Sequence, residues 1–133
     1  MFITKYEKHL YATLRIVTGF LFFWHGSQKL FDFPFAEHDM PMYVIFIAGL
    51  IEFLGGLLIM IGLWTRWVAF IASGEMAYAY WSAHGTFAIL PIMNHGELAM
   101  LYCFILLYIS ARGSGMISIN HYLKRKKYKA SNS

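Results

Sequence analysis

The segment from Tyr43 to Leu63 constrains the fold more than any other part of the chain. It has 21 residues, YVIFIAGLIEFLGGLLIMIGL, and Glu52 near its middle is its single charged residue. At about 1.5 Å of rise per residue, a helix of this length spans about 30 Å, which matches the hydrocarbon core of a bilayer. The segment is therefore predicted to cross a membrane.

Glu52 lies near the middle of this predicted span. A carboxylate at that depth costs at least ~2.5 kcal/mol on insertion scales unless it is protonated, paired or turned toward protein. Small residues lie one turn to either side of it on the same helical face and allow another helix to approach closely. They are Ala48, Gly49, Gly55 and Gly56. We therefore expect Glu52 to face the interior of a helix bundle.

The composition is that of an integral membrane protein. Of the 133 residues 59% are hydrophobic and 14% are charged, and the mean hydropathy is +0.51, far from a soluble globular mixture. The formal net charge is +4, but five basic residues fall in the last ten positions. A short basic run after a membrane helix favours contact with anionic lipid over nucleic acid. Cys103 is the single cysteine, which excludes a disulfide or dithiol relay within one chain.

The apolar runs predict an all-α membrane protein, with residues 1–133 forming a single four-helix domain. The four predicted membrane helices and the basic cytoplasmic tail cover about 10–31, 43–63, 68–88, 96–112 and 113–133. Short connections favour an up-down-up-down bundle. Gly85 and Pro91 leave two alternatives for residues 84–94, which either continue the third helix or form a re-entrant or interfacial segment.

The distribution of charge predicts the orientation of the bundle. The connection at 32–42 is acidic and contains no Lys or Arg. On the opposite side lie Lys5, Lys8, Arg66, Arg112 and the basic tail. By the positive-inside rule, both termini are predicted to lie in the cytoplasm, with the chain passing several times through a bacterial inner membrane.

Residue counting along the predicted helices sorts the buried charges into two groups by depth. Arg15 and Glu75 both fall roughly 8 to 11 Å from the cytoplasmic edge, which predicts a structural ion pair, with a ligand-binding role as the alternative. The second group lies in the outer half and is predicted to bind a ligand. Its members are His25, Lys29, Glu52 and Glu97. The residues predicted to support these groups are Gly26, Gly55, Gly56, Tyr78 and Tyr108.

Three stretches of the chain resemble the DoxX family of small bacterial membrane proteins. They are LRIVTGFLFFWHGSQKLF at 14–31, AGLIEFLGGLLIMIGLWTR at 48–66, and NHGELAMLY with the later GSGMISIN within 94–120. The resemblance extends over about residues 10–120 and implies a four-helix membrane protein. It carries onto Arg15, His25, Gly26, Lys29, Glu52, Gly55, Gly56, Gly62, Arg66, Gly96 and Glu97. Asn120 and His95 depart from the family pattern, which usually has an aspartate and a small or polar residue there.

The resemblance also implies a link to membrane redox chemistry. Some relatives, the DoxD subunits, are associated with thiosulfate:quinone oxidoreductase. Others are associated with membrane complexes that resist oxidative stress, alongside superoxide dismutase and a sulfurtransferase. We therefore predict an accessory or quinone-interacting component of such chemistry, with redox-complex subunits, membrane lipids or a second copy as partners. If the chain is an enzyme, we expect a quinone-linked oxidoreductase subunit.

The residues themselves leave several functions open. A quinone headgroup needs hydrogen-bond donors and a proton route, which the outer polar group offers. The sequence has no cysteine pair, no glycine-rich dinucleotide loop and no CxxCH motif, so electrons would come from a partner or a noncovalent cofactor. One alternative is a haem or metal site between His25 and His84. Against it, His84 would point away from the Glu75 face of a continuous helix, and the His95 to Glu97 spacing does not match the Glu-x-x-His pattern of di-iron bundles, so no metal ligands are assigned. The others are a membrane scaffold or assembly factor, and a protein that binds or transports a small molecule or lipid.

Overall fold

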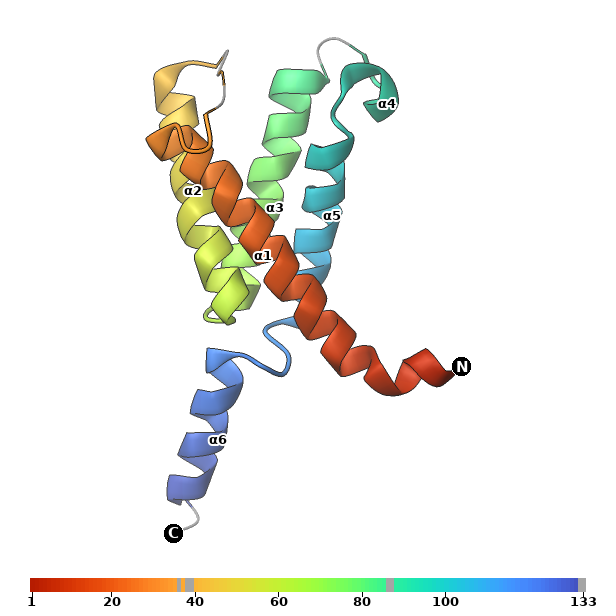
Figure 1. Ribbon diagram of the computed structural model, residues 1–133, viewed down its shortest axis with the longest axis vertical. Helices are drawn as coiled ribbons and strands as arrows, with labels where there is room; N and C mark the ends of the chain where they lie inside the picture. Colours follow the sequence, from red (N-terminus) through yellow and green to blue (C-terminus); the bar gives the residue numbers. More distant parts are fainter. Residues whose placement is uncertain (36, 38–39, 86–87, 132–133) are drawn as a thin grey trace.

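The computed structural model describes residues 1–35, 37, 40–85 and 88–131, and within these ranges every regular element is a helix (Figure 1). The prediction of an all-α fold is therefore confirmed. The elements in chain order are η1 (Phe2–Tyr6), α1 (Glu7–Phe31), α2 (Met42–Ile61), α3 (Thr65–Ala79), η2 (Tyr80–His84), α4 (Pro91–Asn94), α5 (Glu97–Arg112) and α6 (Ile119–Ser131).

A residue in the left-handed conformation ends each of the first two long helices. Helix α1 ends at Asp32, which adopts a left-handed conformation with φ of 51°. Helix α2 starts after Pro41 and ends at Gly62, with φ of 75°. The amide of Leu63 donates to the Leu58 carbonyl at 2.9 Å, a closure that glycine at this position permits. Their bounds lie close to the predicted 10–31 and 43–63.

The third long helix changes its winding before it ends. Helix α3 continues directly into η2, a π-helical turn in which the amide of Gly85 donates to the Tyr80 carbonyl at 2.7 Å. The helical path thus ends at His84, short of the predicted 88. The following segment contains the short helix α4, which lies near the start of α5 (Figure 1).

Helix α1 packs chiefly on α2, and α3 packs chiefly on α5. Figure 1 shows α1 crossing the other long helices diagonally. Glycines bring the α1 and α2 backbones into direct contact. A Cβ atom on Gly19 would lie 2.6 Å from the Met60 nitrogen, and one on Gly26 would collide with the backbone of Phe53. A Cβ atom on Gly56 would collide with the backbone of Phe23.

The apolar core joins the two helix pairs. It is centred on Phe22 of α1, Ile59 of α2, and Leu106 and Ile109 of α5, all fully buried. Alanines from α3 complete it and let α3 approach the other helices. Between α3 and α5, the Ser73 hydroxyl donates to the Cys103 carbonyl at 2.8 Å. The site described below lies in the other part of the α2–α3 interface, toward the start of α2 and the end of α3.

Within the described ranges, α2 is the one helix that is both long enough and apolar enough to cross a membrane by itself. Helix α1 has 25 residues but carries Glu7, Lys8, Arg15 and Lys29, while α3 and α5 have 15 and 16 residues. The four-span topology and the orientation of the termini therefore stay predictions from the sequence.

The close contact between α1 and α2 yields a test with an internal control. We expect Gly26→Ala to lower the unfolding temperature in detergent, because its methyl group would force the α1 and α2 backbones apart. Gly74 on α3 is the matched control, since no heavy atom lies within 4 Å of a Cβ atom placed there.

In an open helical position, exchanging glycine for alanine stabilises by up to about 1 kcal/mol. Gly74→Ala should therefore leave the midpoint unchanged or raise it. Equal behaviour of the two variants, measured by circular dichroism, would contradict backbone contact between α1 and α2.

Candidate functional site

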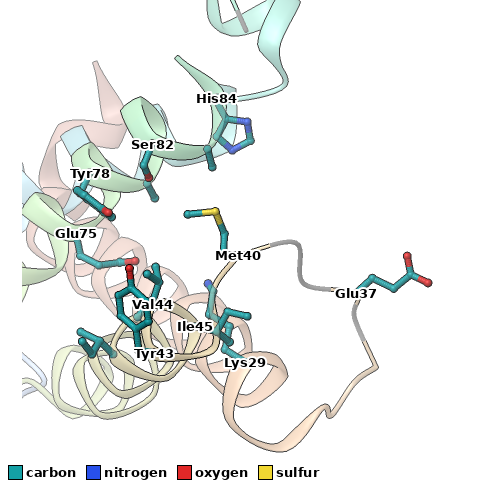
Figure 2. Close-up of a pocket in the computed structure, with 14 residues that line it drawn as sticks. Lys29, Glu37, Met40, Tyr43, Val44, Ile45, Glu75, Tyr78, Ser82 and His84 are labelled. Atoms are coloured by element: carbon teal, nitrogen blue, oxygen red, sulfur yellow. The ribbon is translucent and has the colours of Figure 1, made fainter. Parts of the chain in front are cut away.

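A cavity of about 730 Å³ lies between α2 on one side and α3 with η2 on the other (Figure 2). The connection that precedes α2 contributes Glu37 and Met40, and Lys29 from the end of α1 also lines the cavity. The residues from α2 are Tyr43, Val44, Ile45, Ile47 and Ala48, and those from α3 and η2 are Glu75, Tyr78, Ala79, Ser82, Ala83 and His84.

One wall of the cavity contains polar atoms that have no partner. The Oε2 atom of Glu75 and the Oγ atom of Ser82 are buried and have no hydrogen-bond partner among the described residues. Figure 2 shows Glu75, Tyr78 and Ser82 following one another along α3 and η2. A buried polar atom without a partner costs roughly 1–3 kcal/mol, so a molecule that supplies partners here would recover that free energy.

An ion pair joins α1 to α2 beside this cavity. The Lys29 Nζ atom donates to both carboxylate oxygens of Glu52, at 2.6 and 2.5 Å. Glu52 is 1% exposed, as expected for a carboxylate that faces the bundle interior, while the Lys29 side chain is 25% exposed. The pair compensates the buried charge of Glu52 with a partly exposed ammonium group. Glu75 is the carboxylate that lines the cavity from α3.

The π-helical turn places His84 in the cavity lining. In an uninterrupted α-helix His84 would lie two and a half turns after Glu75, on the opposite face. A π turn takes more residues per turn and rotates His84 back toward the cavity. The ring Nδ1 lies 2.9 Å from the Asn94 carbonyl, which can only accept. Nδ1 therefore donates, and Nε2 is the acceptor of the neutral ring.

Asn94 fixes the connection at this end of the cavity. Its side chain is 5% exposed and donates to the Ala88 carbonyl at 2.7 Å and to the Tyr80 hydroxyl at 3.2 Å. Its Oδ1 atom accepts from the Gly96 amide at 2.8 Å. These bonds hold the described part of the segment between η2 and α5, including α4, in one arrangement above His84.

The predicted Arg15–Glu75 ion pair is not present. The Arg15 guanidinium instead donates to the carbonyls of Ile59, Met60 and Ile117, at 2.5, 2.7 and 2.6 Å. Ile59 and Met60 belong to the last turn of α2, whereas Glu75 shares its cavity with residues of the first turn of α2. Residue counting failed because the N-terminal turns of α1 extend beyond the other helices (Figure 1), so Arg15 lies less deep than expected.

The predicted outer group is partly assembled. Lys29 forms an ion pair with Glu52 and also lines the cavity. His25 is half-buried and packs edge-on against Tyr102 of α5, with ring centroids 5.8 Å apart. Glu97 is exposed at the start of α5 and is not among the residues that line the cavity.

The predicted supporting residues have different places. Tyr78 lines the cavity, and Tyr108 lies at the far end of α5, where its hydroxyl accepts from Arg112 at 2.7 Å. Gly26 and Gly56 lie where the backbones of α1 and α2 are in contact. A Cβ atom on Gly55 would have only ordinary contacts, the nearest with Val68 at 3.4 Å. Because α1 covers the face with Gly56, that face is not available to a partner protein.

Sequence reasoning did not include Ser82 or Tyr43 in the site, and it considered His84 only for the alternative haem or metal site with His25. Ser82 follows Glu75 by seven residues, so helical spacing alone places it on the same face. The position of His84 depends on the π turn, which no residue pattern in the sequence predicted. Tyr43 is the second residue of α2. Its place in the cavity depends on how α2 and α3 are arranged, which the sequence does not specify.

A family model described as DoxX matches residues 10–85. The chain belongs to the DoxX family. The matched part includes α1, α2, α3 and η2, and thus Lys29, Glu52, Glu75, Ser82 and His84. The resemblance drawn from the sequence motifs is confirmed.

Two relatives share most of the length of this DoxX protein. An uncharacterized protein of Haemophilus influenzae is 38% identical over 130 residues, which cover 92% of this chain and 96% of that protein. A Bacillus subtilis protein named "Putative oxidoreductase CatD" is 26% identical over 119 residues, covering 86% of this chain and 87% of its own. No solved structure matches the chain.

The Lys29–Glu52 pair of this DoxX protein is testable by a double-mutant cycle. We expect Lys29→Met and Glu52→Gln each to lower the free energy of unfolding by about 1–3 kcal/mol, because each removes one member of an ion pair whose carboxylate is buried. The double variant should lose less than the sum of the two. Reversible unfolding in mixed micelles measures all three.

The exposed pair between Arg112 and Glu7, with a distance of 2.6 Å, is the control. Removing either or both of its members should have a small, additive effect, since solvent screens exposed pairs. Additive losses at Lys29 and Glu52 would show that the two charges do not depend on one another.

Proposed function

We propose that this DoxX protein spans the inner membrane several times and binds the headgroup of a quinone in the cavity between α2 and α3. It would act there as an accessory or quinone-interacting component of membrane redox chemistry. The observation that carries the proposal is that two residues lining the cavity have buried atoms without a partner among the described residues, Glu75 Oε2 and Ser82 Oγ.

The outward faces of the helices support the membrane part of the proposal. Large apolar side chains on all four long helices are at least half exposed, and soluble monomers rarely carry so much contiguous apolar surface. Examples are Phe46 and Leu54 on α2, Phe70 on α3, and Leu101 and Phe104 on α5. A bilayer would cover these faces, while Glu52 and Arg15 remain buried between helices.

The cavity suits a ligand that is flat, largely apolar and polar at its edges. Its volume of about 730 Å³ falls within the usual range for small-molecule sites. Aliphatic side chains of α2 and the alanines of α3 supply apolar surface. Tyr78, Ser82 and Lys29 supply hydrogen-bond donors of the kind that carbonyl oxygens require.

The same residues can manage protons when a quinone changes its redox state. A protonated Glu75 donates to a carbonyl oxygen, and an ionised Glu75 accepts from a hydroxyl group. Nε2 of neutral His84 is a second acceptor on the same wall. The chain would position and protonate the ligand, and the electrons would come from a partner. The name of the Bacillus subtilis relative, an oxidoreductase, agrees with redox chemistry of this kind.

The quinone site is tested by ligand-induced stabilisation of the purified protein. We expect short-chain ubiquinone or menaquinone analogues to raise the unfolding temperature, since a ligand at 100 times its Kd stabilises by about 2.7 kcal/mol. Glu75→Gln and Ser82→Ala should reduce that shift, because each changes an atom that the cavity leaves without a partner.

Glu97→Gln is the matched control, as it removes a carboxylate outside the cavity lining. It should leave the shift intact. If neither analogue raises the midpoint, or if Glu97→Gln abolishes the shift while Glu75→Gln does not, the proposed site is wrong.

The orientation is tested with single cysteines in a Cys103→Ala background. Phe35 and Ser131 are exposed and lie in the first connection and at the end of α6. We expect an impermeant maleimide to label Phe35→Cys in intact spheroplasts, and Ser131→Cys only after permeabilisation, since the basic tail is predicted to be cytoplasmic. The opposite labelling pattern would reverse the proposed orientation.

A further inference from the structure

A second cavity, of about 220 Å³, lies at the opposite end of the molecule, where the start of α3, the end of α5, the linker after α5 and the first half of α6 come together. Its lining is unusually basic. The residues are Arg66, Arg112, Gly113, Ser114, Gly115, His121 and Lys124. None of these described lining residues is acidic, and the three cations come from three different helices, α3, α5 and α6.

The positive charge in this cavity is only partly compensated. Arg112 is paired with Glu7 at 2.6 Å. Arg66 donates to the Ala111 carbonyl at 2.6 Å, which satisfies hydrogen-bonding groups but brings no negative charge. Gly113 lets the Arg66 guanidinium lie against the backbone, because a Cβ atom there would be 3.0 Å from its Nε atom. Arg66 and Lys124 therefore contribute uncompensated charge to a small polar cavity.

The walls of the cavity are held in place by buried groups. Arg15 donates to the Ile117 carbonyl at 2.6 Å, and Tyr11 donates to the Gly113 carbonyl. The Asn120 amide donates to the Gly62 carbonyl at 3.2 Å and fixes the start of α6 against the end of α2. The cationic side chains thus converge on a supported site rather than on a freely moving tail.

We propose that this cavity binds the phosphate of an anionic phospholipid headgroup. Two exposed tryptophans, Trp64 and Trp67, bracket Arg66 at the same end of the molecule. Tryptophan is enriched at the level of lipid headgroups, so phosphate groups would lie at the depth of the cavity when the chain is embedded. Arginine and lysine are the usual ligands of phosphate, and they bind it most strongly through charge-assisted hydrogen bonds.

This inference depends on the membrane embedding in the proposed function but not on the quinone site. The remaining cations of α6, including Lys127 and Lys129, lie outside the lining of this cavity. They add a general attraction to an anionic surface. Lys124 would thus make a specific contribution to lipid binding, and the other cations of α6 a nonspecific one. The experiment below uses that difference.

The test is native mass spectrometry of the full chain in a neutral detergent, titrated with dioleoyl phosphatidylglycerol or phosphatidylcholine. We expect one phosphatidylglycerol per chain to be retained, at least about tenfold more tightly than phosphatidylcholine. Lys124→Glu should weaken this binding by about tenfold, because it places a carboxylate in the cavity.

Lys129→Glu makes the same charge change on the same helix, outside the cavity, and should weaken binding by less than about threefold. Both positions are exposed, and equal unfolding temperatures will show that both variants fold. Equal weakening by the two variants would overturn the proposal, as it would reveal only general attraction to α6. Inorganic phosphate that competes as strongly as the lipid would also overturn it, in favour of a soluble anion.

The quinone-analogue shift, measured on the same samples, keeps the two proposals distinguishable. Lys124→Glu should leave that shift unchanged, since Lys124 and the first cavity lie at opposite ends of the long helices. Loss of lipid binding with an intact quinone shift would confirm independent sites.

Discussion

Direct backbone contact between α1 and α2 is the constraint on which the rest of the structure depends. Gly19, Gly26 and Gly56 remove the side chains that would keep the two helices apart. The same approach brings Lys29 to Glu52 near one end and Arg15 to the last carbonyls of α2 at the other. Both cations lie on the α1 face that holds Gly19 and Gly26, so the same helix packing provides partners for the buried Arg15 and the partly exposed Lys29.

The two cavities follow from how α1–α2 and α3–α5 are joined. Each pair packs closely within itself, and fewer contacts hold α2 against α3. Where α2 and α3 separate, the polar side chains of α3 and η2 are left beside the aliphatic side chains of α2. At the other end, the linker between α5 and α6 folds back onto Arg15 and Tyr11, and basic side chains gather around it.

The sequence predicts the helices well because their signals are local. Apolar runs and the glycine after α2 define the long helices, and helical spacing places Arg15, Gly19, Phe22 and Gly26 on one buried face. The inward direction of Glu52 follows from the cost of exposing a carboxylate to lipid. These inferences need only one helix at a time.

Relations between helices were predicted less well. The Arg15–Glu75 pair was wrong because equal residue counts give equal depths only when helices start at the same level, and α1 starts beyond the others. Glu97 was expected beside Glu52, yet it is exposed at the start of α5. His84 was left out of the predicted ligand-binding group because a single π turn changes which face of the helix it lies on.

Helices α1 and α2 pack through backbone contact, whereas side chains line the gap between α2 and α3. This difference has a consequence for how this family can diversify. Lys29 belongs both to the cavity lining and to the pair with Glu52, but other lining residues, such as Val44, Ala79 and Ala83, are not among the nearest neighbours of the α1–α2 glycines. Exchanging them would alter which molecule is accommodated while the crossing of α1 and α2 stays the same. At these positions the lining of the cavity can therefore change without disturbing the architecture, whereas a change at Lys29 would affect both.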